Sequence, residues 1–289
     1  MKKLLIVTII ILSTISFSLA SDTGGVFSPM ILNARSAGMG EAYVAVSDDL
    51  GALIYNPAGL VDFPLKIIGF NHLQIPEGFT RVEFIGGGIN LPNISLGFGF
   101  QNKGVISPEE LLYPFSENAF QGSFAKKINP NLSLGGTIYL YLATLDTGSA
   151  SGFGLDLGAI YNLNPNVKIG VVLYNPISFI SWSTGTTESA GRKDLVIGTS
   201  LKFQIGNIPL LFAFDFSFFD KMYFYQRLKL GLESNIPKTP IALRMGYNGE
   251  SNSISFGLGL KAQRLQFDYA FLYTKDLSNQ HVIGFSLEF

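Results

Sequence analysis

The sequence of 289 residues contains no cysteine, only two histidines and little charge. Without cysteine the chain has neither disulfide bonds nor thiolate metal ligands. Charged residues make up 14% of the sequence and the formal net charge is −1, so no basic surplus points to nucleic acid as a partner. Beyond residue 20, no stretch reaches the roughly 18 consecutive apolar residues that indicate a membrane-spanning helix.

Catalytic residues are also scarce. His72 and His281 are the only candidates for an imidazole base, and neither belongs to a recognisable Ser/His/Asp grouping. Two histidines without cysteine do not indicate a zinc site. The glycines at 86–88 lie within a strand pattern that no helix pattern follows, so they are not a phosphate-binding loop. We therefore expect a protein that is not an enzyme and that needs no cofactor or metal.

The first twenty residues are typical of a secretory signal peptide. Lys2 and Lys3 precede an apolar run over 4–12, which small residues follow up to Ala20. This pattern predicts export with cleavage after Ala20. The alternative, a retained membrane anchor, is disfavoured because the apolar run is shorter than the roughly 20 residues that span a bilayer.

Apolar residues are nevertheless abundant, with 25 Phe, 12 Tyr and a mean hydropathy of +0.31. They alternate with small or polar residues, as in LLFAFDFSFF at 210–219, and the pattern recurs over 133–142, 252–261, 264–273 and 281–289. A soluble sandwich would carry Lys, Glu and Thr on its second face, whereas this second face holds Gly, Ser, Asp, Arg and Tyr. The alternation therefore favours a barrel with lipid on one side.

We predict an all-β fold, a transmembrane antiparallel β-barrel of about fourteen strands over 66–289. The strands are expected at 66–75, 80–90, 93–101, 118–128, 132–144, 151–162, 166–175, 192–205, 208–218, 225–236, 239–248, 252–262, 265–273 and 280–289. Connections after even-numbered strands are short turns, and most of the others are longer. Short periplasmic turns, long outer loops and a terminal aromatic residue such as Phe289 are typical of the bacterial outer membrane, whose lipid is then a partner.

Residues 21–65 precede the first strand and follow a different pattern. SDDLGALIYNPAGL at 47–60 predicts a short helix, since Asp48 or Asp49 suits a helix start and Pro57 ends the pattern. Small residues throughout the segment allow close packing in a confined space. We expect an amino-terminal, partly helical plug (hatch) in the bore, rather than a disordered tail, because the segment holds many apolar side chains.

The run ARSAGMGEAYVAVSDDLGALIYNPAGL at 34–60 resembles the amino-terminal signature of the PorV/PorQ family, within the FadL-like superfamily of outer-membrane transporters of hydrophobic compounds. The resemblance implies a fourteen-stranded barrel with a hatch and passive uptake of a hydrophobic ligand, a fatty acid or an aromatic compound. The implied hatch motif consists of Asp48, Asp49, Asn56, Pro57, Ala58 and Gly59. The alternative is a PorV-like docking barrel that serves protein secretion and surface attachment with a secretion-system partner protein.

Two predicted outer loops, 104–120 and 175–185, are rich in large apolar side chains. Exposed apolar groups mark a binding site, a partner contact or the membrane interface, where Trp and Tyr collect. Capture of a hydrophobic ligand and interface anchoring or partner contact both remain open for these loops. The candidate capture residues are Leu111, Leu112, Tyr113, Phe115, Ile177, Phe179, Ile180 and Trp182.

Strict alternation places a mixed set of charges on the inner face of the barrel. The two signs are nearly balanced, so no single-sign ring indicates ion selection. We expect paired charges, some of them holding the plug through Arg35, Glu41, Asp48 or Asp49. The predicted lumen charges are Arg81, Glu83, Asp156, Asp215, Arg227, Lys229, Glu233, Arg244, Lys261, Asp268 and Glu288.

Overall fold

The computed structural model describes residues 27, 33–75, 80–105, 115–146, 148–219, 222–275 and 279–289. The expected signal peptide lies outside these residues, as do three of the candidate capture residues, Leu111, Leu112 and Tyr113. The strands are β1 (Lys66–Ile75), β2 (Thr80–Asn90), β3 (Ser95–Val105), β4 (Phe115–Asn129), β5 (Leu132–Leu145), β6 (Gly148–Asn164), β7 (Val167–Trp182), β8 (Thr187–Glu188), β9 (Asp194–Ile205), β10 (Ile208–Ser217), β11 (Leu228–Asn235), β12 (Ile241–Asn248), β13 (Ser253–Ala262), β14 (Leu265–Thr274) and β15 (Gln280–Glu288).

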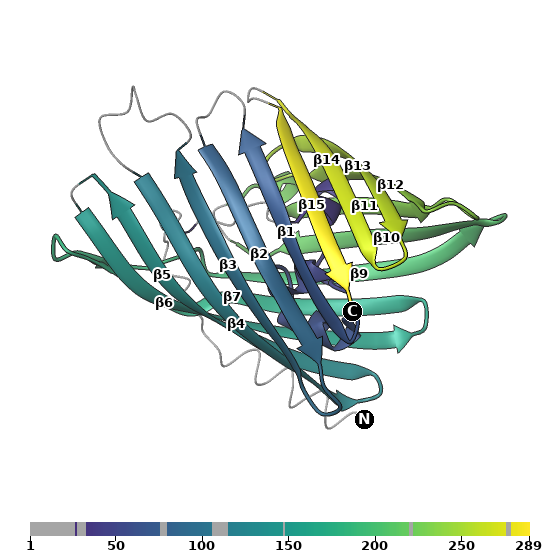
Figure 1. Cartoon of the computed structure of the whole chain (residues 1–289), viewed down its shortest axis with the longest axis horizontal. Helices are drawn as coiled ribbons and strands as arrows, with labels where there is room; N and C mark the ends of the chain where they lie inside the picture. The colour runs from purple at the N-terminus through teal and green to yellow at the C-terminus, as the bar shows by residue number, and fades with distance from the viewer. Residues whose placement is uncertain are drawn as a thin grey trace.

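The sheet closes on itself as an antiparallel barrel (Figure 1). Each long strand pairs with its neighbours in the chain, and β1 pairs with β15 across the seam. The two-residue β8 pairs with the last part of β7, beyond the residues that pair with β9. Fourteen strands therefore form the wall, which confirms the predicted fold class. Closure leaves no open sheet edge, a requirement for a sheet that crosses lipid.

The two ends of the barrel differ in their connections. Short turns such as 130–131, 165–166, 206–207 and 263–264 gather at one end, here called the turn end. Most longer connections, including those that lead from β7 to β9 and from β10 to β11, are at the opposite end, here called the loop end. The connection expected over 145–150 is shorter, because β5 continues to Leu145 and β6 already begins at Gly148, further than the alternation alone predicts.

The outer face carries a continuous row of apolar side chains that follows the strand pairing. Most members of the row expose between about a third and 60% of their surface, as residues that contact lipid should. Aromatic rings touch along it, with centroids 4.8 Å apart for Phe100 and Phe120 and 4.9 Å apart for Phe267 and Phe285. The row runs through Phe267, Phe285, Phe70, Ile85, Phe100, Phe120, Leu140, Phe153 and Phe179.

Residues 33–63 fill the bore and are called the plug here; they appear in purple inside the barrel in Figure 1. The plug contains α2 (Ala34–Gly38), which contacts β12 to β15, and η1 (Leu50–Leu53) and η2 (Pro57–Asp62), which contact β1 to β6. Its large side chains are almost fully buried. Met39, Tyr43 and Leu60 expose none of their surface, so the plug makes the interior of the barrel a packed protein core.

The single helix expected over 47–60 is two short 3₁₀ helices. Asp49 caps η1 by accepting from the Gly51 amide at 2.8 Å, and Asn56 caps η2 by accepting from the Ala58 amide at 3.1 Å. Pro57 opens η2 instead of ending a helix, because its fixed φ suits the first helical position and its missing N–H is not needed there.

Candidate functional site

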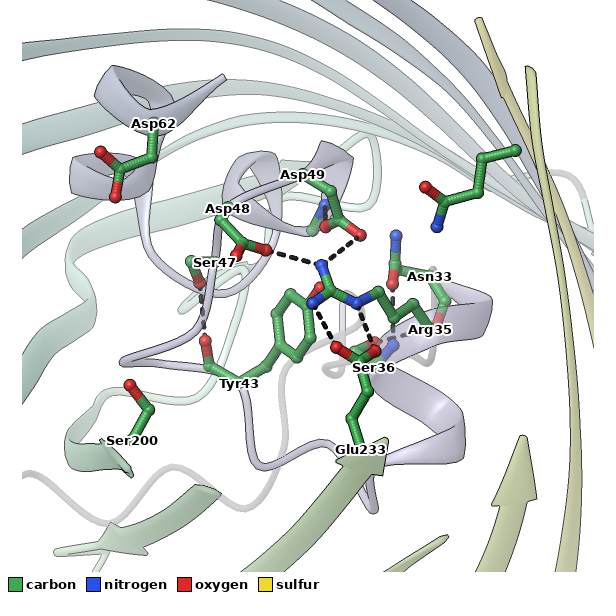
Figure 2. Close-up of polar contacts among 12 residues, drawn as sticks. Asn33, Arg35, Ser36, Tyr43, Ser47, Asp48, Asp49, Asp62, Ser200 and Glu233 are labelled. Carbon is green, nitrogen blue, oxygen red and sulfur yellow. Dashed lines mark hydrogen bonds and ion pairs between the residues drawn. The ribbon is translucent and has the colours of Figure 1, made fainter. Parts of the chain in front are cut away.

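Arg35 of α2 is the centre of an ion-pair cluster inside the barrel (Figure 2). Its guanidinium donates twice to Glu233 of β11, with both N–O distances 2.8 Å. It also donates to Asp48 at 2.6 Å and to Asp49 at 3.3 Å, both in the plug. The guanidinium carbon lies over the ring of Tyr43, 5.6 Å from the ring centroid. Arg35 therefore joins two parts of the plug to the barrel wall.

The cluster continues around the wall. Arg244 of β12 donates to Glu233 at 2.6 Å and to Asp268 of β14 at 2.7 Å, and its side chain is only 2% exposed. Burial alone would lower the pKa of Arg35, but Asp48 and Glu233 together hold this pKa well above its usual range. The arginine therefore stays charged, and removing it would leave the partly buried Asp48 and Asp49 without a cation and Glu233 with Arg244 alone.

Asn56, at the other end of the plug, contacts a second part of the wall. Its carboxamide nitrogen donates to the Val44 carbonyl at 2.9 Å and to the Ala159 carbonyl of β6 at 3.2 Å. The same side chain caps η2, so it satisfies the plug backbone and the wall together. Asn56 is fully buried. The NPAG sequence suits this position for two reasons. The Asn56 amide bridges the plug and β6, and Pro57 begins η2.

Glycines of the wall lie where the plug backbone approaches most closely. They form cross-strand pairs, and a Cβ on one member would collide with the plug: on Gly135 it would lie 2.5 Å from the carbonyl carbon of Pro57. On Gly231 it would lie 2.6 Å from the Met39 carbonyl oxygen. The small inner face seen in the sequence therefore makes room for the plug, for its backbone at three of the pairs and for the Leu50 and Leu53 side chains at Gly69 and Gly86. The pairs are Gly69 with Gly86, Gly135 with Gly158, Gly170 with Gly198, and Gly231 with Gly246.

A cavity of about 130 Å³ lies between the plug and the loop end of the barrel. One side of it is aromatic. Phe27 stacks on Tyr141 with ring centroids 4.3 Å apart, and Tyr139 stacks on Tyr141 at 5.6 Å. Tyr174 donates its hydroxyl hydrogen to the Tyr55 carbonyl of the plug at 2.6 Å. Tyr139 and Tyr141 alternate with leucines in the sequence, so their inward position was predictable, but their role as a cavity wall was not.

The other side of the cavity is charged. Lys229 contacts Glu41 of the plug at 2.7 Å, and Arg192 contacts Glu250 and Asp194, the latter at 3.1 Å. Burial opposes ionisation of Glu250, yet Lys229 and Arg192 together hold its pKa below the usual range. Every charge in this group has an opposite partner, so the cavity is amphipathic without a strong preference for one sign.

A second hollow, an open recess of about 590 Å³, lies on the turn-end side of the plug. Arg35 and Asp48 line it from the plug, whereas Val44, Ile54 and Tyr55 of the plug line the aromatic cavity. The plug therefore separates two hollows within one bore. A molecule that moves from one to the other must displace plug residues.

Strand β7 is bulged beside the cavity. On β6 a single residue separates Leu155 from Leu157. On β7 three residues separate their pairing partners, Ile177 and Leu173. Asn175 in this bulge has a left-handed φ of 48°, and its amide donates to Asp156 at 2.8 Å. The following residue is a proline, which has no N–H for the ladder. The wall is therefore less tightly hydrogen-bonded here than along its regular strands.

The expected outer loop at 175–185 is a strand for most of its length. β7 continues to Trp182, and this places Ile177 and Phe179 on the outer face with 60% and 48% of their surface exposed. Ile180 points inward and is fully buried, near the aromatic side of the cavity. The prediction of a capture loop is therefore wrong for Ile177 and Phe179, because the bulge lets the β6–β7 ladder extend beyond it. Phe115 begins β4.

Seven of the eleven charges predicted for the lumen face the bore, two lie on the outer face and two lie on the turn-end rim. Asp156, Asp215, Glu233, Arg244 and Asp268 are at most 8% exposed, and Arg227 and Lys229 line the cavity. The lumen prediction is wrong for Arg81 and Glu83, which lie on the outer face, where Glu83 contacts His72 at 2.9 Å. Lys261 and Glu288 pair at 2.7 Å on the turn-end rim, with the lysine side chain 51% exposed.

The reversed face of β2 has a physical cause. Val82 and Phe84 occupy its inner face because they pack with Leu53 in the apolar core between plug and wall. Alternation alone gives two possible faces, and the usual rule assigns the charged one to the lumen. The rule fails where the plug, and not water, covers the inside of the wall.

Within the described part of the chain, no helix has the length and apolar character needed to cross a membrane. The same residues contain no group of three or more His, Asp or Glu side chains placed to hold a metal ion.

No protein-family model and no curated protein matches the sequence. The structure is similar to that of the monoaromatic hydrocarbon channel CymD, with a TM-score of 0.65 and 15% identity over 89% of this chain and 97% of that one. It is similar to the Pseudomonas putida toluene transporter TodX, with a TM-score of 0.65 and 13% identity over 92% and 100%. For the Ralstonia pickettii toluene transporter TbuX the TM-score is 0.63, with 13% identity over 89% and 98%. The chain therefore has the barrel fold that these channels share.

Proposed function

We propose that this protein lets small hydrophobic molecules, aromatic hydrocarbons among them, cross the bacterial outer membrane passively. The main support is the cavity, whose volume of about 130 Å³ is close to the roughly 150 Å³ of an apolar protein cavity that binds benzene. Phe27, Tyr139 and Tyr141 offer ring faces and edges to a monoaromatic guest. The similar solved structures include a monoaromatic hydrocarbon channel and toluene transporters.

The route begins at the loop end, where the cavity lies, and the plug blocks its continuation. Arg35 and Asn56 hold the plug at two separate places on the wall. Movement of the plug between these two contacts joins the cavity to the recess on the turn-end side. In this proposal the hatch motif, Asp48, Asp49 and Asn56 to Gly59, keeps the bore closed at rest.

A second exit is the bulge in β7. Tyr174, Asn175 and Asp156 line the cavity and also form the irregular part of the β6–β7 ladder. An apolar guest that leaves here enters the lipid sideways and avoids the charged recess. The missing ladder bonds of the bulge favour opening at this place over the regular strands.

The finer assignment to the PorV/PorQ family rests on the amino-terminal motif at 34–60 alone. That family includes docking barrels for protein secretion. A mature protein that fails to take up hydrocarbon, yet co-purifies with a large secretion subunit, would favour docking over transport.

Filling the cavity tests the transport proposal. Val196 lines the cavity from β9, whereas its neighbour Ile197 points outward and is 37% exposed. We expect Val196→Phe to abolish binding of toluene and its uptake by cells that lack other hydrocarbon channels. Ile197→Phe adds a phenyl ring to the lipid face of the same strand and leaves both unchanged.

Two controls make the test specific. A low conductance in planar bilayers shows that the plug of Val196→Phe is still seated, and heat-modifiable migration on gels shows that the barrel is folded. Normal toluene uptake by a folded, closed Val196→Phe protein contradicts the proposed route.

A further inference from the structure

Lys229 lies between two carboxylates that belong to different segments, the plug and the turn between β12 and β13. Its ammonium is 2.7 Å from Glu41 of the plug and 3.8 Å from Glu250, in the turn between β12 and β13 at the loop end. Only the first distance is that of a hydrogen bond. Glu250 therefore sits about 1 Å too far to take the lysine, close enough to compete for it.

Arg192 keeps Glu250 in this position. It forms the shorter contacts with the Glu250 carboxylate, and it also contacts Asp194 at 3.1 Å. The guanidinium lies 4.9 Å from the ring centroid of Phe219. Arg192 belongs to the connection before β9 and Glu250 to the turn after β12, so their contact joins two segments at the loop end.

Glu41, the plug residue in this series of ion pairs, has an unfavourable backbone conformation. Glu41 has a left-handed φ of 60°, directly after Gly40 at 61°. Such a backbone is uncommon for a residue with a side chain. Lys229 and Asn248, whose amide donates to the same Glu41 oxygen at 3.1 Å, fix the side chain of Glu41. Loss of these partners favours release of the turn at 39–42.

We propose that Arg192 and Lys229 form a charge relay that couples the loop end of the barrel to the plug. While Arg192 holds Glu250, Lys229 holds Glu41 and the plug stays seated. When Arg192 releases Glu250, this carboxylate takes Lys229 and Glu41 loses its main partner. Glu41, Lys229, Glu250 and Arg192 all line the aromatic cavity, so the relay, which rests on the proposed transport function, lets an arriving guest loosen the plug.

The relay predicts an unusual rescue. Arg192→Met frees Glu250 and should loosen the plug, whereas the double variant Arg192→Met/Glu250→Gln removes the competitor and should seat it again. If Arg192 and Glu250 were only two independent supports of the plug, the double variant would instead loosen the plug more than Arg192→Met alone. The chain has no cysteine, so Ser47→Cys in the plug, where Ser47 is fully buried, supplies a single thiol whose labelling rate reports plug opening.

We expect Arg192→Met to raise the labelling rate of that thiol by about five-fold or more, and Glu250→Gln to return it to the starting rate. Lys229→Met should raise the labelling rate both in the wild-type background and in the Glu250→Gln background. Arg192→Lys, which keeps a charge beside Asp194 but not the double contact, serves if the methionine variant does not fold, and it should be rescued in the same way.

Lys168→Met is the matched control. Lys168 of β7 contacts Asp62 of η2 at 2.6 Å, so its removal breaks another contact between plug and wall, but Lys168 is not part of the cavity lining. Glu250→Gln should not reverse the effect of Lys168→Met. A failure of Glu250→Gln to rescue Arg192→Met, or an equal rescue of Lys168→Met, overturns the relay. All labelling is done without hydrocarbon, so its outcome is independent of the Val196→Phe uptake test.

Discussion

The carboxamide of Asn56 lies against the Cα of Gly158, in the space that a Cβ would occupy. Gly158→Ala should therefore push Asn56 and Pro57 away from β6, at a cost of about 1–3 kcal/mol to plug docking. The expected result is a higher conductance in planar bilayers with the barrel still folded. Gly122→Ala is the control, because a Cβ on Gly122 of β4 meets nothing within 4 Å. Equal conductance in both variants would rule out this packing contact as a constraint on the plug.

Arg35→Met should unseat the other end of the plug. It leaves Glu233, Asp48 and Asp49 without their shared cation, and breaking such a buried pair costs about 3–5 kcal/mol. Conductance should rise and limited proteolysis should cut within residues 33–63. Lys261→Met removes an exposed ion pair on the turn-end rim, where the expected loss is at most about 1 kcal/mol. A plug that stays protected in Arg35→Met would show that the other contacts between plug and wall, among them those of Asn56, Glu41 and Asp62, suffice.

The contact of Glu250 with Arg192 should depend on pH. The folded-state pKa of Glu250 is lowered, so its ionised form stabilises the fold at every pH above the ordinary glutamate value of 4.5. This contribution is lost as the pH falls below 4.5 and through the lowered pKa. The difference in melting temperature between the wild type and Glu250→Gln should be constant from pH 5 to 8 and vanish in stronger acid. A difference that already fades at pH 6 would contradict the assignment.

The lipid face can be tested on a single strand. Ile138, near the middle of β5, is 44% exposed on the outer face, and Thr144 lies on the same face near the loop end. Ile138→Arg should reduce barrel stability in vesicles by about 2–4 kcal/mol, since it places a charge deep in the hydrocarbon, whereas Thr144→Arg should cost about 1 kcal/mol or less. Folding titrations in urea measure both. Similar costs at the two sites would mean that the hydrocarbon does not cover Ile138.

The barrel itself could be predicted from the sequence because each strand repeats the same two-residue period. The Phe-rich face of 210–219 points outward, while Leu211, Ala213 and Asp215 point inward and are at most 9% exposed. Register and closure follow once the strands are counted and the turns are short. These features depend on local sequence alone.

Features that depend on the plug could not be predicted. The outward position of Arg81 and Glu83 requires knowing that Leu53 covers the inside of β2, a contact between distant parts of the chain. The strand through Trp182 requires the bulge at Asn175, and nothing in the sequence beyond Asn175-Pro176 signals it. The pairing of Glu41 with Lys229 spans 188 residues. Alternation gives the faces of a strand but not what lies against them.

The pairing of β1 with β15 has a consequence for biogenesis. It joins residues 66–75 to residues 280–288, the most distant strands of the chain, and the Phe289 amide completes it by donating to the Lys66 carbonyl at 3.0 Å. Closing so large a loop carries the greatest entropic penalty of any strand pairing in the molecule. The plug packs closely against wall glycines in the closed cylinder. We therefore expect the plug to dock while this seam is still open, which would make its docking a step of barrel assembly.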